Sequence, residues 1–166
     1  SVRNAALIHF STTIHQENSR KDIKRMSAKT QKTLEGKPKL SVISFCLNSG
    51  SFLRETIESV LNQTYKNFEF IIKDGGSTDG TIEILKDYPQ IRWVSEKEVT
   101  DNPVHEALCQ AFDMARGDYI IYLAISDGIS DPNWFKKAVE VLDSDTEVSW
   151  VWGVSQAKSE SGHLWG

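Results

Sequence analysis

The sequence contains few cysteines and no long apolar segment. Cys46 and Cys109 are the two cysteines among 166 residues. Two thiols are too few for a metal cluster, so we expect both to lie buried as small apolar groups, in a reducing compartment. The longest apolar run, residues 119–125, falls well short of the roughly 20 residues that cross a bilayer. These scarcities argue against a metal-cluster protein and against a membrane-spanning chain.

Three sequence patterns are also missing. The glycines fit neither the G-x-x-x-x-G-K-[ST] pattern of a P-loop nor the G-x-G-x-x-G pattern of a dinucleotide-binding turn, so a P-loop nucleotidase or a dehydrogenase is not supported. The chain starts with Ser1 rather than Met, and its first residues lack the apolar stretch and cleavage site of a signal peptide. We therefore interpret the sequence as a piece of a longer protein.

Basic residues concentrate at the start of the chain. Residues 1–39 carry nine Lys and Arg against three Asp and Glu, whereas the remainder carries ten against twenty. With 39% hydrophobic and 25% charged residues, the composition is that of one globular domain. We expect a basic segment or linker over residues 1–38 and the folded domain over residues 39–166. The segment has no nucleic-acid-binding motif and few aromatic residues, so we expect no nucleic-acid partner.

Apolar residues alternate between strand-like and helix-like spacing along the domain. Buried strands are predicted over residues 40–47, 68–72, 91–94, 119–124 and 148–152. Helices are predicted over residues 52–61, 81–86, 103–115 and 132–142, the first of them capped by Ser51. This alternation predicts an α/β fold with a mainly parallel sheet and helices on both faces.

Short polar side chains follow three of these strands. Asn48, Asp74 and Asp127 come after the first, second and fourth strand. Each alone is a common turn residue, but the carboxyl ends of parallel strands share one edge, where ligands bind in such folds. Asp74 precedes two glycines and a helix start, which suits a ribose or base beside a diphosphate. Asp127 offers oxygen ligands for Mg²⁺ or Mn²⁺, whereas the nearby Asp131 is better explained as a helix cap.

Three stretches together resemble the opening of the family 2 glycosyltransferases. They read SVIS at residues 41–44, SVLNQTY at residues 59–65 and DGGSTDGT at residues 74–81. The resemblance extends over about residues 39–153 and implies the nucleotide-sugar-binding fold called GT-A, which is Rossmann-like. It also implies transfer of a sugar, with inversion, from a nucleotide diphosphate donor to an acceptor hydroxyl, in polysaccharide biosynthesis.

The resemblance also implies roles for individual residues. Asp74 would bind the base and ribose, and Asp127 would bind the metal ion, Mn²⁺ or Mg²⁺. The metal motif, often S-D-D in the family, aligns with residues 125–127, and an offset of one residue stays open. The implied nucleotide-sugar-binding positions are Ser44, Cys46, Asn48, Asp74, Gly76, Asp101 and Ser126.

The remaining implications concern the reaction partners. The family's general base follows the part covered here, so we expect it beyond Gly166 and leave the catalytic residue unassigned. The implied donor is a UDP-sugar, and the acceptor is a carbohydrate or a lipid-linked molecule. The implied location is cytoplasmic, with peripheral association at the inner face of a membrane.

The sequence departs from the family pattern at several positions. Ser126 stands where the family usually has a carboxylate, Pro103 replaces a glycine, and Cys109 replaces an asparagine. Ser126, Gly128 and Cys109 therefore also suit a non-catalytic nucleotide-sugar-binding module, or degenerate transferase, in a larger protein. A domain that serves only in assembly is a third hypothesis, for which the basic segment is the one hint.

Overall fold

The computed structural model describes residues 36–97 and 103–153, and outside these ranges four two-residue strands. The main sheet has five parallel strands in the order β1-β6-β3-β4-β5. They are β1 (Leu7–Ile8), β3 (Leu40–Cys46), β4 (Phe68–Asp74), β5 (Arg92–Ser95) and β6 (Tyr119–Tyr122). The helices of the described residues are α1 (Leu53–Leu61), α2 (Thr81–Lys86), α3 (Pro103–Met114) and α4 (Trp134–Ser144).

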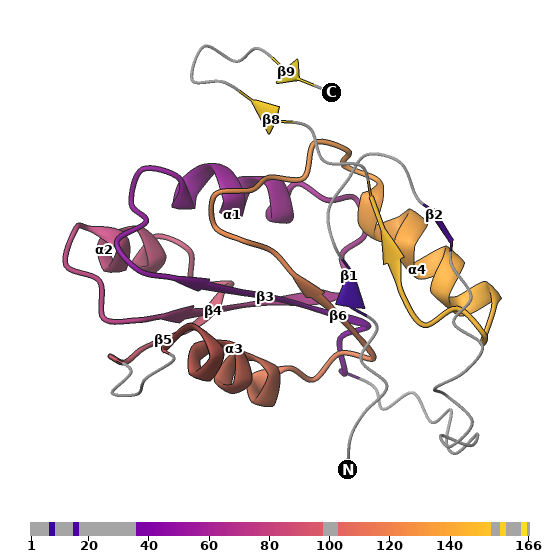
Figure 1. The fold of residues 1–166 in the computed structure, drawn as a ribbon, viewed down its shortest axis with the longest axis horizontal. Coiled ribbons are helices and arrows are strands. Elements are labelled where there is room, and N and C mark those ends of the chain that lie inside the picture. The colour runs from indigo at the N-terminus through magenta and orange to yellow at the C-terminus, as the bar shows by residue number, and fades with distance from the viewer. Residues whose placement is uncertain are drawn as a thin grey trace.

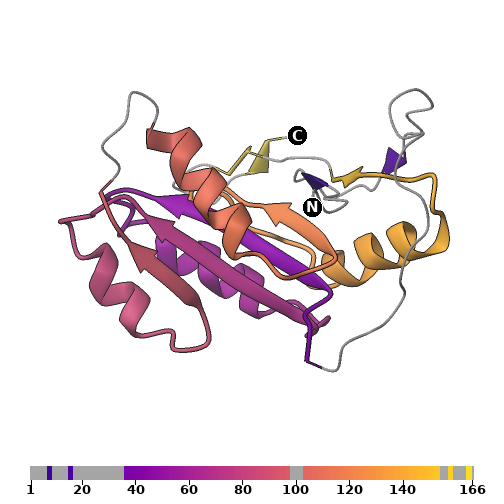
Figure 2. The same cartoon turned by 90° about the horizontal axis from the view of Figure 1, so that it is seen from below.

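Helices cover both faces of this sheet. Helices α1 and α2 lie on one face and α3 on the other (Figures 1 and 2). Side chains alternate accordingly along the strands: Val42 and Ile72 belong to the larger core cluster with α1, α2 and α4, whereas Ile43 and Ile71 pack with α3. The predicted fold class is therefore confirmed. None of the helices described here combines the length and the apolar character needed to cross a bilayer.

Two small antiparallel sheets accompany the main sheet. Strand β2 (His15–Gln16) pairs with β7 (Val151–Trp152), and β8 (Ala157–Lys158) pairs with β9 (Leu164–Trp165). The predicted strand over residues 148–152 is thus wrong in length, and its remnant β7 lies outside the main sheet. The Val148 amide closes a turn onto the Asp145 carbonyl at 3.1 Å, which keeps the start of this stretch out of a strand. Strands β1 and β2 precede residue 38, and the proposed domain boundary there stays a prediction.

Two predicted helix starts are also wrong. Helix α1 has Phe52 rather than Ser51 as its N-cap, without a side-chain cap, because the Ser49 carbonyl accepts from the Phe52 and Leu53 amides at 3.1 and 3.0 Å. Helix α4 begins at Trp134 instead of residue 132. The helix is preceded by a turn at residues 131–133, in which the Asp131 carbonyl accepts from the Trp134 amide at 3.1 Å.

The prediction that both cysteines are buried is right for Cys46 and wrong for Cys109. Cys46 lies in the core at 2% exposure. On α3 the buried side chains include Ala107 and Ala111. Cys109 is two residues beyond Ala107, which turns it about 200° around the helix and onto the exposed side.

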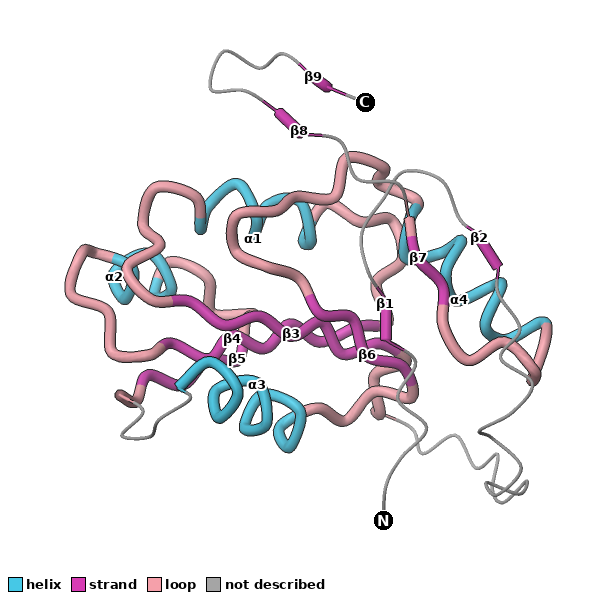
Figure 3. Tube along the Cα trace, viewed as in Figure 1, coloured by secondary structure: helices cyan, strands magenta, loops and turns pink. Residues whose placement is uncertain are grey.

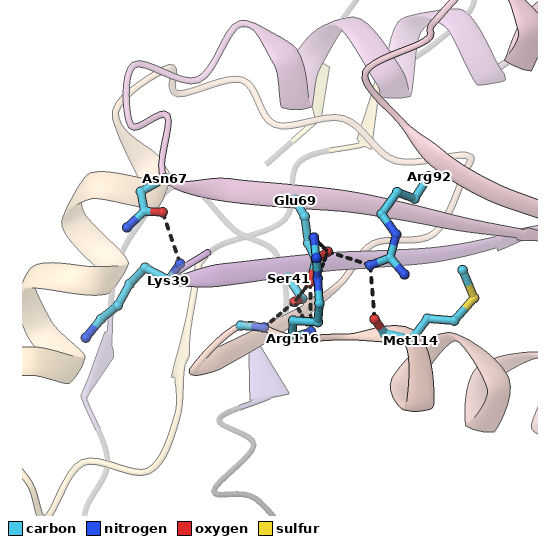
Figure 4. Close-up of polar contacts among 8 residues, drawn as sticks. Lys39, Ser41, Asn67, Glu69, Arg92, Met114 and Arg116 are labelled. Carbon is cyan, nitrogen blue, oxygen red and sulfur yellow. Dashed lines mark hydrogen bonds and ion pairs between the residues drawn. The ribbon is translucent and has the colours of Figure 1, made fainter. Parts of the chain in front are cut away.

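A buried carboxylate fastens the end of α3 to the amino end of the sheet (Figure 4). Glu69 accepts from Ser41 Oγ at 2.7 Å, from the Arg116 amide at 2.7 Å and from the guanidinium groups of Arg116 and Arg92 at 2.9 and 2.7 Å. Burial alone would raise the pKa of Glu69, but these hydrogen bonds hold it below its usual value. A Cβ at Gly117 would lie 2.5 Å from the Ser41 amide nitrogen, so only glycine allows this approach.

Candidate functional site

Three loops leave the carboxyl edge of the sheet. We call them the β3 loop (residues 47–52), the β4 loop (residues 75–80) and the β6 loop (residues 123–133). Figure 3 shows the β3 and β4 loops leaving the same end of the sheet, and in the register of the strands Cys46 is opposite Asp74. Parallel strands thus bring together groups that are far apart in the sequence, as predicted for this edge.

Asp74 anchors the start of the β4 loop. Its side chain is buried, and its Oδ2 accepts from the Gly76 and Ser77 amides at 2.9 and 3.0 Å and from Ser95 Oγ at 2.6 Å. Its Oδ1 accepts from the Ser77 hydroxyl and, at 3.5 Å, from the Cys46 thiol. Burial alone would raise the pKa of Asp74, yet these hydrogen bonds hold it below its usual value. Direct contact of this carboxylate with a base or ribose stays a prediction.

Ser44 and Cys46 are also turned inward. Ser44 is fully buried and donates its hydroxyl to the Leu123 carbonyl at 2.6 Å, joining β3 to the β6 loop. Burial and the neighbouring Asp74 charge raise the pKa of the Cys46 thiol, so it stays protonated and donates to Asp74. Both side chains are bound to other residues inside the protein. Their contact with a nucleotide sugar stays a prediction.

The β3 and β4 loops are joined by hydrogen bonds between their facing sides. Asn48 has a φ of +50°, in the left-handed region that Asn tolerates. In this conformation the backbone amide of Asn48 donates to Ser77 Oγ at 2.7 Å, and its side-chain oxygen accepts from the backbone amide of Thr78 at 2.9 Å. Asp79 Oδ2 accepts from the Gly50 amide at 3.0 Å. Asn48 therefore lies at the predicted edge, where it holds two loops together.

Asp79 is a site residue that the sequence interpretation missed. A position just before a helix is that of an ordinary local cap, and Asp79 Oδ1 does accept from the Thr81 amide at 3.1 Å. Hydrogen bonds from Thr81 and Gly50 lower its pKa. The contact with Gly50 spans 29 residues, and no spacing in the sequence signals it.

The backbone conformation at residue 76 favours glycine. Its φ of +86° is unfavourable for any other residue type, and a Cβ there would lie 3.3 Å from the Lys97 Cβ. The β4 loop thus passes close to the segment after β5. Asp101, predicted to bind the sugar, lies outside the described residues.

The β6 loop presents the predicted metal ligand. Ser126 and Asp127 are both exposed, and Ser126 Oγ lies 3.2 Å from Asp127 Oδ1. Burial, together with the Asp127 charge, raises the pKa of Tyr122 at the end of β6. Asp131 instead accepts from the Asn133 amide at 2.9 Å and pairs with Lys137 at 2.6 Å. The N-cap of α4 is Asn133, so the prediction that Asp131 caps this helix is wrong, although its carboxylate is bound beside the helix start.

The donor set at this edge suits a metal ion that shares its ligands with a substrate. Asp127 and Ser126 supply one carboxylate and one hydroxyl, and the described residues contain no group of three His, Cys, Asp or Glu able to hold a metal. Mg²⁺ commonly uses one or two carboxylates and takes its other ligands from substrate phosphates and water. The residues present fit such an ion when a diphosphate is bound.

Comparison of the fold places the chain in the GT-A class. TarS of S. aureus superposes with a TM-score of 0.57 at 24% identity, over 64% of this chain and 32% of that chain. Mannosyltransferase PcManGT from Pyrobaculum calidifontis, solved with GDP-Man and Mn²⁺, gives 0.56 at 21% identity, over 64% and 32%. The sequence model described as "Glycosyl transferase family 2" matches residues 41–165, and the chain belongs to this family. The predicted family is therefore confirmed.

Two curated relatives show how much of a longer protein the chain matches. EpsE of Bacillus subtilis, whose name describes it as a glycosyltransferase, is 39% identical over 113 residues, which is 64% of this chain and 39% of that protein. Chondroitin synthase of Escherichia coli is 29% identical over 136 residues, 80% of this chain and 19% of that protein. The chain thus spans about two fifths or less of the length of these relatives.

Proposed function

We propose that this chain is the donor-binding part of a metal-assisted, inverting glycosyltransferase and binds a nucleotide-diphospho-sugar at the carboxyl edge of its sheet. The observation that carries the proposal is the exposed Asp127 carboxylate in the β6 loop, on the same edge as the joined β3 and β4 loops. A UDP-sugar is the favoured donor, supported by the TarS complex with UDP-GlcNAc, which is 25% identical with a TM-score of 0.52.

The chemistry assigns a distinct task to each part of the edge. Asp127 and Ser126 would hold Mn²⁺ or Mg²⁺ together with the diphosphate oxygens. When bound, such an ion neutralises the charge that develops on the departing diphosphate. Asp74 binds the amides of its own loop and so fixes the shape of the β4 loop, whose outward side would contact the nucleoside.

The proposal extends to the rest of the reaction. The acceptor is a hydroxyl of a carbohydrate or lipid-linked molecule, and the general base that deprotonates it follows Gly166. Residues 1–38 would be a basic segment and residues 39–166 the GT-A domain, with strands β1 and β2 of the segment pairing with β6 and β7 of the domain. The nine basic residues among residues 1–39 support a cytoplasmic location at the inner face of a membrane.

Calorimetry of UDP binding to the 166-residue chain tests the metal assignment. We expect UDP to bind more tightly in Mn²⁺ than in EDTA, because the ion converts the repulsion between the diphosphate and Asp127 into a bridge. Asp127→Ala should abolish this gain, and Asp131→Ala, the matched control, should keep it because Asp131 is bound to α4. A full gain in Asp127→Ala would place the metal elsewhere.

The same assay tests the nucleoside side of the edge. Asp74→Ala opens the β4 loop and also removes the carboxylate proposed to accept a hydrogen bond from the nucleoside. It should weaken UDP binding in EDTA by about ten- to a hundredfold, since a charge-assisted hydrogen bond to the ligand contributes about 1.5–3 kcal/mol. Asp87→Ala, an exposed acid after α2, is the control and should leave the affinity unchanged. Unaltered UDP affinity in a folded Asp74→Ala protein contradicts the assignment.

A non-catalytic nucleotide-sugar-binding module is the second candidate. It is favoured by the single carboxylate at the metal motif, beside which Ser126 supplies only a hydroxyl. A working transferase in its full-length form should release free sugar from its donor slowly and in a metal-dependent way, with water as substitute acceptor. A binding module should bind the donor and release none.

A further inference from the structure

Thr56 connects α1 to the β6 loop from inside the protein. Its side chain is 1% exposed, and its Oγ1 lies 2.5 Å from the Ile125 carbonyl oxygen and 2.7 Å from the Asp127 carbonyl oxygen. A threonine hydroxyl carries one hydrogen, so the two carbonyls share a single donor. The two carbonyls belong to residues 125 and 127, so the Thr56 hydroxyl holds both ends of the short turn between them.

This contact leaves the backbone of Asp127 fixed on both sides. The Asp127 amide donates to the Ala124 carbonyl at 3.0 Å, and the Asp127 carbonyl accepts from Thr56. The side chain itself is exposed, with the Ser126 hydroxyl 3.2 Å from its Oδ1. The freedom that remains to the carboxylate is thus mainly rotation about its own side-chain bonds.

The far end of the β6 loop is held by a residue that follows α1. Gln63, two residues beyond the last residue of α1 and fully buried, donates to the Asp131 carbonyl at 2.8 Å and accepts from the Phe135 amide at 3.0 Å. Thr56 on α1 and Gln63 after the helix therefore form hydrogen bonds with the two ends of the β6 loop. Thr56 is the residue that bonds the loop at Asp127.

We propose that Thr56 is a positioning residue for the Asp127 carboxylate, holding the turn that presents this carboxylate to a divalent cation and a donor diphosphate. The inference rests on the proposed function, in which Asp127 binds the ion. Groups that orient a metal ligand contribute to affinity without touching the metal, because a ligand held in place loses less freedom on binding. Without the hydroxyl, two carbonyls next to a buried position lack their donor, and the turn has to move to regain one.

The test compares Thr56→Val, which removes the hydroxyl at nearly constant shape, with Thr56→Ser, which keeps it. UDP affinity is measured in EDTA and in Mn²⁺, and the ratio of the two is the metal gain. We expect Thr56→Val to lose about tenfold or more of the gain while its affinity in EDTA stays at the wild-type value. Thr56→Ser should restore the gain. Thr64→Val is the matched control, since its hydroxyl contacts Asn133 Oδ1 at 2.9 Å, away from Asp127.

The outcomes separate this inference from the proposed function. If Asp127→Ala abolishes the metal gain and Thr56→Val keeps all of it, the positioning role is wrong and the metal assignment stands. If wild type shows no gain, or Asp127→Ala keeps it, both fail. Equal weakening of UDP binding in EDTA and in Mn²⁺ by Thr56→Val also overturns the inference, because it indicates a general structural role. Should Thr56→Val not fold, Thr56→Ala takes its place, and a folded Thr56→Ala protein with full gain overturns the inference.

Discussion

At the scale of single residues, Ser126 and Gly128 flank Asp127 in the β6 loop and each has room for a carboxylate. Ser126 is exposed. A Cβ added at Gly128 would lie 3.7 Å from the Cβ and Oγ of Ser59, which is ordinary van der Waals contact. The loop thus accepts an acid on either side of Asp127, and the two substitutions distinguish the two alignments of the metal motif.

Ser126→Asp should tighten Mn²⁺ binding in the presence of UDP by several-fold, because it adds a hard anionic oxygen next to Asp127. Gly128→Asp serves as the matched variant, since it adds the same charge on the other side. Titration of each protein with Mn²⁺ at saturating UDP measures the effect. A larger gain from Gly128→Asp would shift the metal motif by one residue.

At the scale of elements, α3 is attached to the sheet by polar contacts at its carboxyl end. Glu69 lies under that end and is the shared acceptor for Ser41, Arg92 and Arg116. The ion pairs involve exposed guanidinium groups, so their stabilising effect comes mainly from keeping the buried carboxylate satisfied. This network lies at the amino end of the strands, opposite the candidate site.

Glu69→Gln should lower the free energy of unfolding by about 2 kcal/mol, because the charged acceptor of several hydrogen bonds becomes neutral. Urea denaturation of the 166-residue chain measures the change. Glu140→Gln on the exposed side of α4 is the control, and its weak contact with Lys136 at 3.9 Å should make its effect small. UDP affinity of the folded Glu69→Gln protein should match wild type, and a loss of binding would contradict the separation of the two ends.

The sequence predicted the central strands and the helices but not β1, which lies in the expected basic segment, and it predicted the contacts at the edge only in part. Apolar runs predicted β3, β4 and β6 because strands buried on both faces consist of such runs. The position of Asp131 before a helix predicted a cap, whereas its carboxylate binds the Asn133 amide and Lys137 and the N-cap is Asn133. Asn48 and Asp79 act across loops about 30 residues apart, which a spacing rule cannot detect. Thr56 left a signal, since it lies within the apolar stripe of α1 between Leu53 and Val60.

At the scale of the whole molecule, buried carboxylates make stability depend on pH. The pKa values of Asp74 and Glu69 both lie below their usual range in the folded protein. A carboxylate whose pKa falls on folding stabilises the native state fully above its unfolded pKa of about 4. This stabilisation is lost as the pH falls through the folded pKa.

We therefore expect the free energy of unfolding to fall steeply below about pH 4. Asp74→Asn, which cannot titrate, should be less stable than wild type at pH 7 by about 1.5–3 kcal/mol, and the difference should shrink towards pH 3. Chemical denaturation of both proteins at several pH values measures it. A constant difference in the free energy of unfolding over this pH range would show that folding does not lower the pKa of Asp74.

The hydrogen bonds that join the β3 and β4 loops have a consequence for chimeric proteins. Asn48 pairs with Ser77 and Thr78, and Gly50 pairs with Asp79, so each loop supplies the complement of the other. Transplanting one loop from a relative that has other residues at these positions would leave amides and a carboxylate without partners, whereas transplanting both loops keeps each group with its own partner. The two segments therefore form a single exchangeable module, and recombination between relatives is best tolerated when its crossover points lie before residue 47 and after residue 81.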